Sequence, residues 1–264
     1  MNTKKHLFKI FAFVLIAVFT LSCSETTEAP QPQKDVTVQK VKKKKAPKKK
    51  QYKTLNNETA PAFLKKYGET HKGNTVEVTC KFGTITIKLY DDTPLHRANF
   101  LYMIERGYFD LTQFYRVEKD FIAQAGNSDD WDCAGLANKI GHYKLPNEIN
   151  TNKHIHLRGA VAAARLSDNN PDKLSSNFEW YISMGQAYNE PTMRGFMREY
   201  GFKYSPAQVE AYGTRGGTPT LDKQYTVFGE VISGMDVVEK INQEEVDKKA
   251  WPKDIIPIKV KLID

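Results

Sequence analysis

Cysteine and long apolar runs are both scarce in this sequence, and each scarcity excludes a class of protein. The three cysteines, Cys23, Cys80 and Cys133, are too few for a disulfide framework. Cys80 and Cys133 would pair only in an oxidising compartment, so two free thiols are the default expectation. One long apolar run, residues 10–21, stands near the N-terminus, and it is too short to span a bilayer comfortably. No second apolar stretch follows it, so we expect no membrane-spanning helix.

A surplus of positive charge is also missing from most of the chain, although the net charge is +8. Residues 1–74 hold 16 lysines and 5 acidic residues, a net charge of +11. The remaining residues hold 23 basic and 26 acidic side chains, a net charge of −3. The basic character therefore belongs to an N-terminal tail, and we expect no nucleic-acid-binding surface on the folded part.

Residues 1–22 have the pattern of a secretory signal peptide. Lys4, Lys5 and Lys9 precede the short apolar run, and Thr20-Leu21-Ser22-Cys23 follows. This ending resembles a bacterial lipobox, in which the cysteine is acylated and becomes the first residue of the mature protein, although Thr20 stands where leucine is usual. Cys23 is thus a lipidation candidate, which predicts a protein anchored to a membrane of the bacterial cell envelope and facing the periplasm or the cell surface. The alternative is a cleaved signal with an incidental cysteine.

Residues 23–57 are predicted to form a disordered linker rich in lysine and proline. The lysine run at 42–50 repels itself and should be extended. It serves either to attract anionic lipid headgroups or as a solvated spacer, and the spacer is the favoured interpretation. Residues 58–74 are expected to be a helical lead-in to the domain, with a short helix near 58–66.

From residue 75 onward, short runs of alternating apolar and polar residues predict a mainly β domain. Val76, Val78 and Cys80 alternate in this way, and so do Ile256, Ile258 and Val260 at the end of the chain. Further strands are expected at 83–89, 113–117, 121–125, 159–165, 178–183 and 225–231. Two helices are predicted, one from Pro94 to about residue 106 and one at 235–242. Many short strands with two helices and no βαβ rhythm indicate a closed antiparallel barrel with helical caps.

Three motifs in this order resemble the cyclophilins. Gly83-Thr84-Ile85-Thr86-Ile87 with Asn99-Phe100 looks like the opening of the family. Phe114-Tyr115-Arg116-Val117 with Phe121 and Gln124 looks like its active-site signature. Tyr225-Thr226-Val227-Phe228-Gly229 with Gly234-Met235-Asp236 looks like its closing motif. The resemblance covers residues 75–264, with an insertion near 186–217.

This resemblance implies a closed eight-stranded antiparallel β-barrel capped by two α-helices, with a peptide groove on its outer face. It also implies peptidyl-prolyl cis-trans isomerase activity on proline-containing unfolded or exported polypeptides, with no cofactor and no metal. Nothing in the sequence indicates a dimer interface, so a monomer is expected.

The chemistry of prolyl isomerisation explains why an arginine is needed. The barrier of about 18–20 kcal/mol arises from amide resonance, so no covalent step is required. A twisted amide has a basic, pyramidal nitrogen, and a fixed donor aimed at that nitrogen stabilises the transition state. Arginine suits this role because it stays protonated and its guanidinium is rigid.

The resemblance assigns the reaction to Arg116, Phe121 and Gln124. Arg116 is the catalytic guanidinium, Phe121 forms the floor of the proline pocket, and Gln124 orients the arginine and bonds the substrate backbone. The remaining substrate-binding positions are Ile122, Ala164, Arg165, Glu179, Tyr181, Leu221 and Tyr225.

Some positions depart from the family pattern. Glu179 replaces a glutamine and brings a negative charge near Arg116, while Ala125 and Asn127 replace a glycine and an aspartate. These changes leave a second hypothesis open, namely a proline-peptide-binding chaperone or tether with low turnover.

Two other clusters of polar residues are candidate sites. His154 and His156 are spaced like a metal pair on a strand, but no third ligand is near, so structural histidines are expected. Ser128-Asp129-Asp130-Trp131-Asp132 lacks the spacing of a calcium loop and is expected to be solvated.

Overall fold

The computed structural model describes residues 52–264. The predicted signal peptide, Cys23, most of the predicted linker and its lysine run lie outside the described residues.

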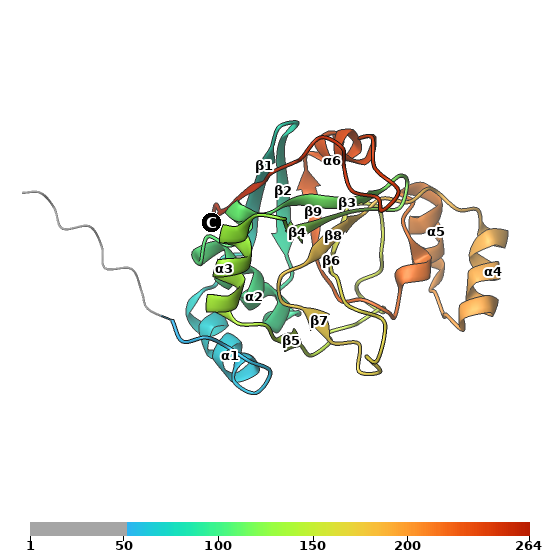
Figure 1. Ribbon diagram of the computed structural model, residues 1–264. Coiled ribbons are helices and arrows are strands. Elements are labelled where there is room, and N and C mark those ends of the chain that lie inside the picture. The colour runs from blue at the N-terminus through green and yellow to red at the C-terminus, as the bar shows by residue number, and fades with distance from the viewer. Residues whose placement is uncertain (1–51) are drawn as a thin grey trace, which may run out of the picture. The chain divides into compact units, whose positions relative to one another are not determined.

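An eight-stranded antiparallel sheet forms the centre of the domain (Figure 1). Its strands lie in the order β10-β1-β2-β9-β6-β8-β4-β3. Their bounds are β1 Thr75–Cys80, β2 Gly83–Leu89, β3 Gln113–Glu118, β4 Ile122–Asn127, β6 Ala160–Ala163, β8 Trp180–Ser183, β9 Val227–Ser233 and β10 Lys259–Leu262. A separate two-stranded sheet joins β5 (Lys144–Leu145) to β7 (Ser175–Ser176).

The alternating residues of the sequence form the interior of this sheet. Val76 pairs with Ile87, and Val78 pairs with Ile85, and all four side chains are fully buried. Alternate residues of a strand point to opposite faces, so these four share the inner face. The predicted β1–β2 hairpin is therefore confirmed, with its turn at residues 81–82.

The sheet curls but does not close into the barrel that the sequence predicted. No ladder joins β10 to β3 among residues 52–264, and the two edges are linked only near Pro257, by an isolated bridge to Gln113. Phe114 N–H donates to the Ile256 carbonyl at 3.0 Å beside this bridge. Proline has no backbone N–H to donate to a ladder, so Pro257 interrupts the pairing at this point and leaves the seam incomplete.

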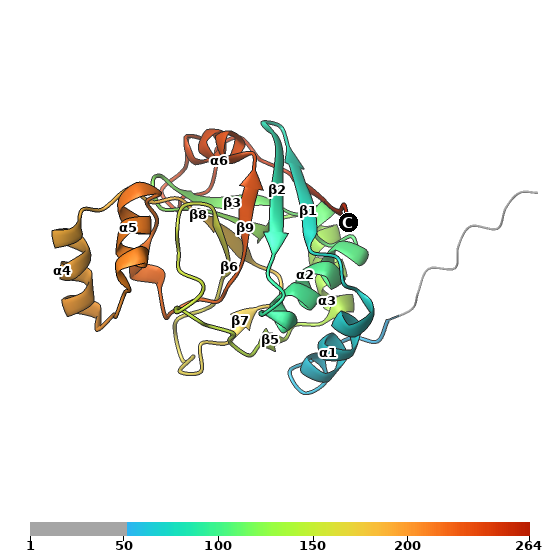
Figure 2. The ribbon, with the colours of Figure 1, turned by 180° about the vertical axis from the view of Figure 1, so that it is seen from behind.

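Helices surround the sheet, and two of them, at Trp131–Ile140 and Pro206–Thr214, are not predicted by the sequence. The two expected helices are present as α2 (Pro94–Glu105) and α6 (Met235–Asn242). The other α-helices of the described residues are α1 Ala60–Thr70, α3 Trp131–Ile140, α4 Glu190–Tyr200 and α5 Pro206–Thr214. Figure 2 shows α1, α2 and α3 at one side of the sheet and α4 and α5 at the opposite side. Short 3-10 turns, η1 (Phe109–Leu111) and η2 (Pro219–Leu221), complete the elements.

The lead-in segment is part of the folded core. Leu64 of α1 is fully buried, and Tyr67 contacts the ring of Tyr102 on α2. Residues 52–57, which the sequence assigned to the linker, are also held by the domain. Leu55 N–H donates to the Ile140 carbonyl at 2.8 Å, and the Leu55 side chain is buried. Folded structure therefore begins before residue 57, because apolar side chains of this segment cover α2 and α3.

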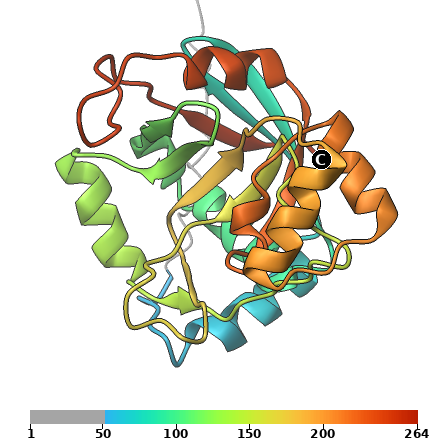
Figure 3. The same ribbon diagram turned by 90° about the vertical axis from the view of Figure 1, so that its right-hand side faces the viewer.

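The insertion near 186–217 contributes the pair α4 and α5, which stand in front of the sheet in Figure 3. Met193 and Tyr212 are fully buried and form a small hydrophobic cluster with Ile155. The spacing of Met193, Phe196, Met197 and Tyr200 in the sequence predicts a short amphipathic helix, and these residues lie on α4.

No helix among residues 52–264 combines the length and the apolar composition needed to cross a membrane.

Candidate functional site

The predicted apolar site residues come together in one hydrophobic cluster that is separate from the main core. Ile122 and Tyr181 lie on neighbouring strands β4 and β8, and Leu221 ends η2. The Tyr181 and Tyr225 rings meet edge to face, with centroids 5.7 Å apart. The cluster consists of Ile122, Ala160, Ala162, Ala164, Tyr181 and Val227, with Tyr90, Phe121, Leu221 and Tyr225 packed against it.

The polar site residues lie in register with this cluster across four strands. Arg116 of β3 pairs with Gln124 of β4, which pairs with Tyr181 of β8, which pairs with Ala162 of β6. Directly paired residues of antiparallel strands project to the same face. One row on one face therefore carries a guanidinium, an amide and an aromatic ring.

Arg116 has two side-chain partners. Its Nη1 donates to Gln124 Oε1 at 3.4 Å. Its Nη2 forms an ion pair with Glu118, two residues along the same strand and thus on the same face. The two side chains of this pair are 37% and 38% exposed, so the guanidinium remains accessible from solvent.

Tyr115 connects this row to Glu179 because β3 is irregular at that point. The ladder register shifts between Phe114 and Arg116, so Tyr115 is the extra residue of a bulge. Its hydroxyl accepts from Gln124 Nε2 and donates to Glu179 Oε1 at 3.1 Å. The hydrogen bonds thus run in one direction, from Arg116 through Gln124 and Tyr115 to a carboxylate.

The hydrogen-bond partners of the Glu179 carboxylate are Tyr115 and Asn127, whereas the sequence analysis placed its charge near Arg116. Asn127 Nδ2 lies 3.4 Å from Glu179 Oε1, and the carboxylate that pairs with Arg116 belongs to Glu118 instead. Burial raises the pKa of the Glu179 carboxyl above its usual range, while the Tyr115 and Asn127 hydrogen bonds oppose that rise. The pKa of the Tyr115 hydroxyl is raised as well, mainly by burial and then by the neighbouring Glu179.

Gly126 fixes the close approach of β4 to the segment that carries Glu179. It has φ +99°, and a Cβ placed on it would lie 2.1 Å from the Phe178 carbonyl oxygen. Only glycine adopts this conformation without strain and leaves that space free. Gly126 therefore allows Asn127 and Glu179 to meet.

Arg165 is bound to the loop before β9. Its Nε donates to the Gln224 carbonyl at 2.7 Å, and its Nη2 lies 3.0 Å from Gln224 Oε1. The guanidinium also lies over the Tyr225 ring, 4.9 Å from the centroid. Arg165 thus holds Tyr225 against the cluster, whereas Ala164 before it is buried.

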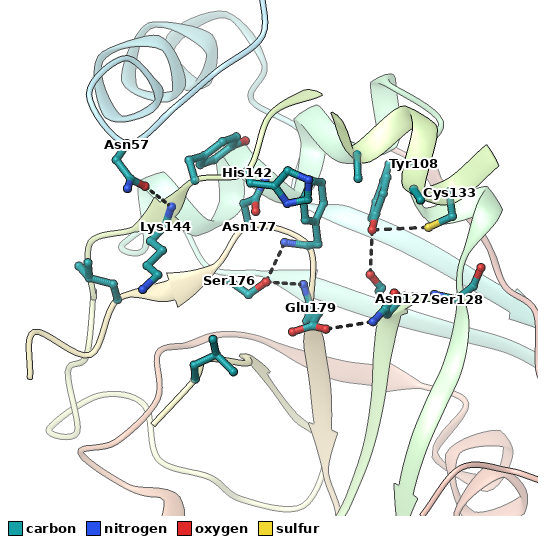
Figure 4. A pocket seen from close by; sticks show the side chains of 17 residues that line it. Asn57, Tyr108, Asn127, Ser128, Cys133, His142, Lys144, Ser176, Asn177 and Glu179 are labelled. Carbon is teal, nitrogen blue, oxygen red and sulfur yellow. Dashed lines mark hydrogen bonds between the residues drawn. The ribbon is translucent and has the colours of Figure 1, made fainter. Parts of the chain in front are cut away.

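A cavity of about 550 Å³ adjoins the Glu179 side of the row (Figure 4). Asn127 and Glu179 line it from β4 and the segment before β8, and Cys133 lines it from α3. The Cys133 thiol lies 3.6 Å from the Tyr108 hydroxyl and is buried. Cys80 and Cys133 are both free, which agrees with the expectation of two thiols.

The two histidines considered as a metal pair have different partners. His154 Nε2 lies 2.8 Å from Asp92, and its ring stacks on Tyr90. His156 is buried against Asp222 and Tyr181. Within residues 52–264, no group of three or more His, Cys, Asp or Glu side chains is placed to hold a metal ion.

Three features of the site escaped the sequence analysis. Glu118 stands two residues after Arg116. On a strand this spacing places both side chains on one face, so it is the sequence pattern from which their ion pair could have been predicted. Tyr115 reaches the site only through the bulge, which no local pattern marks. The link from Tyr181 to His156 and Asp222 joins segments 25 and 66 residues apart and has no local signal either.

Comparisons with known proteins agree with this geometry. The family model "Cyclophilin type peptidyl-prolyl cis-trans isomerase/CLD" matches residues 75–261. A Staphylococcus epidermidis protein described as a peptidyl-prolyl cis-trans isomerase is 28% identical over 214 residues, which is 81% of this chain and 97% of that protein. A Staphylococcus aureus protein of the same description is 29% identical over 202 residues, or 76% of this chain and 92% of that protein.

Solved structures show the same fold. A Cryptosporidium parvum cyclophilin type peptidyl-prolyl cis-trans isomerase superimposes with a TM-score of 0.52 at 20% identity, covering 73% of this chain and 98% of that one. A second structure of that protein, in the presence of the dipeptide Ala-Pro, gives a TM-score of 0.51 at 21% identity, covering 72% of this chain and 99% of that one. With the family model matching most of its length, the chain belongs to the cyclophilin-type peptidyl-prolyl cis-trans isomerase family.

Proposed function

We propose that this protein catalyses cis–trans isomerisation of X–Pro bonds in exported polypeptides, with Arg116 as the electrostatic catalyst. The observation that carries the proposal is the row Arg116–Gln124–Tyr181 on one face of the sheet, beside the apolar cluster that includes Phe121. A guanidinium next to an apolar pocket is what a twisting prolyl amide requires. The cluster accepts the proline ring, and the guanidinium meets the amide nitrogen.

In this mechanism no bond is made or broken. The Phe121, Leu221 and Tyr181 side chains hold the ring while the amide rotates about its C–N bond. As resonance is lost, the nitrogen becomes a hydrogen-bond acceptor, and an Arg116 N–H donates to it. This interaction is absent in both ground states, so it lowers the barrier without favouring either isomer.

A protease-coupled isomerisation assay on a soluble fragment beginning near residue 52 tests the proposal. We expect Arg116→Ala to lower kcat/KM by about a hundred-fold, which is typical of the loss of one transition-state donor. Arg198→Ala is the matched control, because Arg198 is an exposed arginine of α4 away from the row. Equal activity of Arg116→Ala and Arg198→Ala would reject the mechanism.

A second function, peptide binding with slow turnover, is favoured by one observation. The Arg116 guanidinium is already paired with Glu118, so an incoming amide must compete with a carboxylate. NMR titration of an Ala-Pro peptide, together with the rate of isomerisation, separates the two functions. If the wild type binds the peptide tightly but does not accelerate its isomerisation, the protein is a peptide-binding tether. If the wild type accelerates isomerisation and Arg116→Ala does not, the protein is an enzyme.

We further propose that the protein is lipid-anchored through Cys23 in the bacterial cell envelope. The lipobox-like residues 20–23 support this proposal, as does the position of the family domain after residue 74. The segment between Cys23 and the domain then serves as a spacer. Mass spectrometry of the mature N-terminus tests the anchor directly, and Cys23→Ala should move the protein from the membrane fraction to the soluble fraction. An unmodified Cys23 in a membrane-bound wild type would contradict it.

A further inference from the structure

A buried polar network joins the 186–217 insertion to the apolar cluster of the site. Its central group is the Asp222 carboxylate, which is 1% exposed. Asp222 Oδ2 accepts from the Tyr212 hydroxyl at 2.6 Å and the Tyr204 hydroxyl at 2.7 Å. Asp222 Oδ1 lies 2.8 Å from both the backbone N–H and the ring Nδ1 of His156. His156 Nε2 lies 3.0 Å from the Tyr181 hydroxyl, which completes what we call the Asp222 network.

The direction of these hydrogen bonds follows from the chemistry of the groups. The His156 backbone N–H can only donate, and an ionised carboxylate can only accept. Nδ1 of His156 therefore carries a proton toward Asp222. The other ring nitrogen, Nε2, is the hydrogen-bond partner of the Tyr181 hydroxyl. Four donors surround one buried carboxylate, which offsets the cost of removing its charge from water.

Two of those four donors come from the insertion. Tyr212 lies on α5 and is fully buried, and Tyr204 lies just before α5. Burial and the charge of Asp222 raise the pKa of both hydroxyls, so both remain protonated donors at any physiological pH. The insertion is also joined by a backbone hydrogen bond to the segment that follows His156, since Arg158 N–H donates to the Gly216 carbonyl at 3.0 Å.

The other end of the network is a wall of the site. Tyr181 is paired with Gln124 in the catalytic row, and its ring contacts Tyr225. A ring held at its hydroxyl end has less freedom to tilt than one held by apolar contacts alone. The position of this wall, and hence the fit of a proline ring, depends on His156 and Asp222.

We propose that the insertion is a positioning element for the substrate pocket, acting from Tyr212 and Tyr204 through Asp222 and His156 on the Tyr181 ring. Tyr204, Tyr212, His156 and Asp222 are thus positioning residues and touch no substrate. The inference rests on the proposed function in that the pocket is taken to bind proline peptides. It adds that peptide affinity is set in part by two hydroxyl groups on the far side of the pocket wall.

The test is a double-mutant cycle on peptide affinity, measured by NMR titration with an Ala-Pro peptide so that it does not depend on turnover. Tyr212→Phe removes one hydroxyl and keeps the ring that fills the core. We expect it to raise Kd by about three- to ten-fold, the range of energetic coupling through such networks. Tyr188→Phe is the matched control, because Tyr188 belongs to the same small cluster and no hydrogen bond of its hydroxyl is seen among the described residues.

The cycle is completed in a Tyr181→Phe background, where the network no longer reaches the wall. In that background Tyr212→Phe should change Kd by less than about two-fold, because without the Tyr181 hydroxyl the loss of the Tyr212 hydroxyl no longer reaches the pocket wall. An equal effect of Tyr212→Phe in both backgrounds would overturn the proposal, and so would an effect matched by Tyr188→Phe. Circular dichroism confirms that each variant is folded.

The two proposals fail in different ways. A wild type that binds the peptide but does not accelerate isomerisation contradicts the enzyme and leaves the cycle fully measurable. A wild type that accelerates isomerisation with an additive cycle contradicts only the positioning role. Absence of any peptide binding overturns both.

Discussion

The ion pair between Arg116 and Glu118 makes a quantitative prediction about the resting site. Glu118→Gln keeps the size of the side chain and removes its charge. Both partners are more than a third exposed, so water screens the pair and its strength is that of a surface ion pair, about 0.2–1 kcal/mol. An incoming amide no longer competes with a carboxylate in this variant. We therefore expect kcat/KM to rise by up to about five-fold.

The assay for this prediction is isomerisation at low and high salt. Added salt should raise wild-type activity toward that of Glu118→Gln, because screening weakens the same pair. Asp129→Asn is the matched control, since Asp129 is an exposed acid on the loop after β4. A ten-fold fall in the activity of Glu118→Gln would contradict this prediction, because it would mean that Glu118 aims the guanidinium at the substrate.

Two more predictions concern stability. Because burial raises the pKa of the Glu179 carboxyl, the unfolded chain releases this proton at a lower pH than the folded protein does. The folded state therefore loses stability as the pH rises from the ordinary glutamate pKa through the raised one. Urea unfolding should show Glu179→Gln gaining stability relative to the wild type between pH 4 and pH 7, and a constant difference would contradict this. Leu64→Ala on α1 should cost about 2–5 kcal/mol, because Leu64 is fully buried; a loss below 1 kcal/mol in the same assay would mean that α1 is dispensable.

Local signals explain which helices the sequence predicted. The α6 helix agrees with its expected bounds because Gly234 supplies a left-handed φ of +88° before it and Val237, Val238 and Ile241 form one apolar stripe. The α3 helix was missed because its acidic start was interpreted as a solvated loop. Asp130 in fact caps this helix by accepting from the Asp132 N–H at 2.7 Å.

The residues of the candidate site were also only partly predictable from the sequence. The apolar positions were predictable, because motif order along the chain identifies them even when they are far apart in sequence. The contacts of the polar and charged groups were not predictable. Tyr115 reaches Glu179 only because of a strand bulge, and the hydrogen bond from Tyr212 to Asp222 forms only because α5 of the insertion packs beside the loop that carries Asp222. A sequence indicates that Glu179 and Arg116 share a site, but only the fold shows which carboxylate pairs with the guanidinium.

Arg116 is proposed to act on the transition state and not on peptide binding, and NMR exchange spectroscopy of an Ala-Pro peptide separates these two effects. One experiment yields both the cis–trans exchange rate and the peptide Kd. We expect Arg116→Ala to slow catalysed exchange by about a hundred-fold while Kd changes by less than about three-fold. Exchange at the wild-type rate in Arg116→Ala, or a loss of exchange explained wholly by weaker binding, would contradict it.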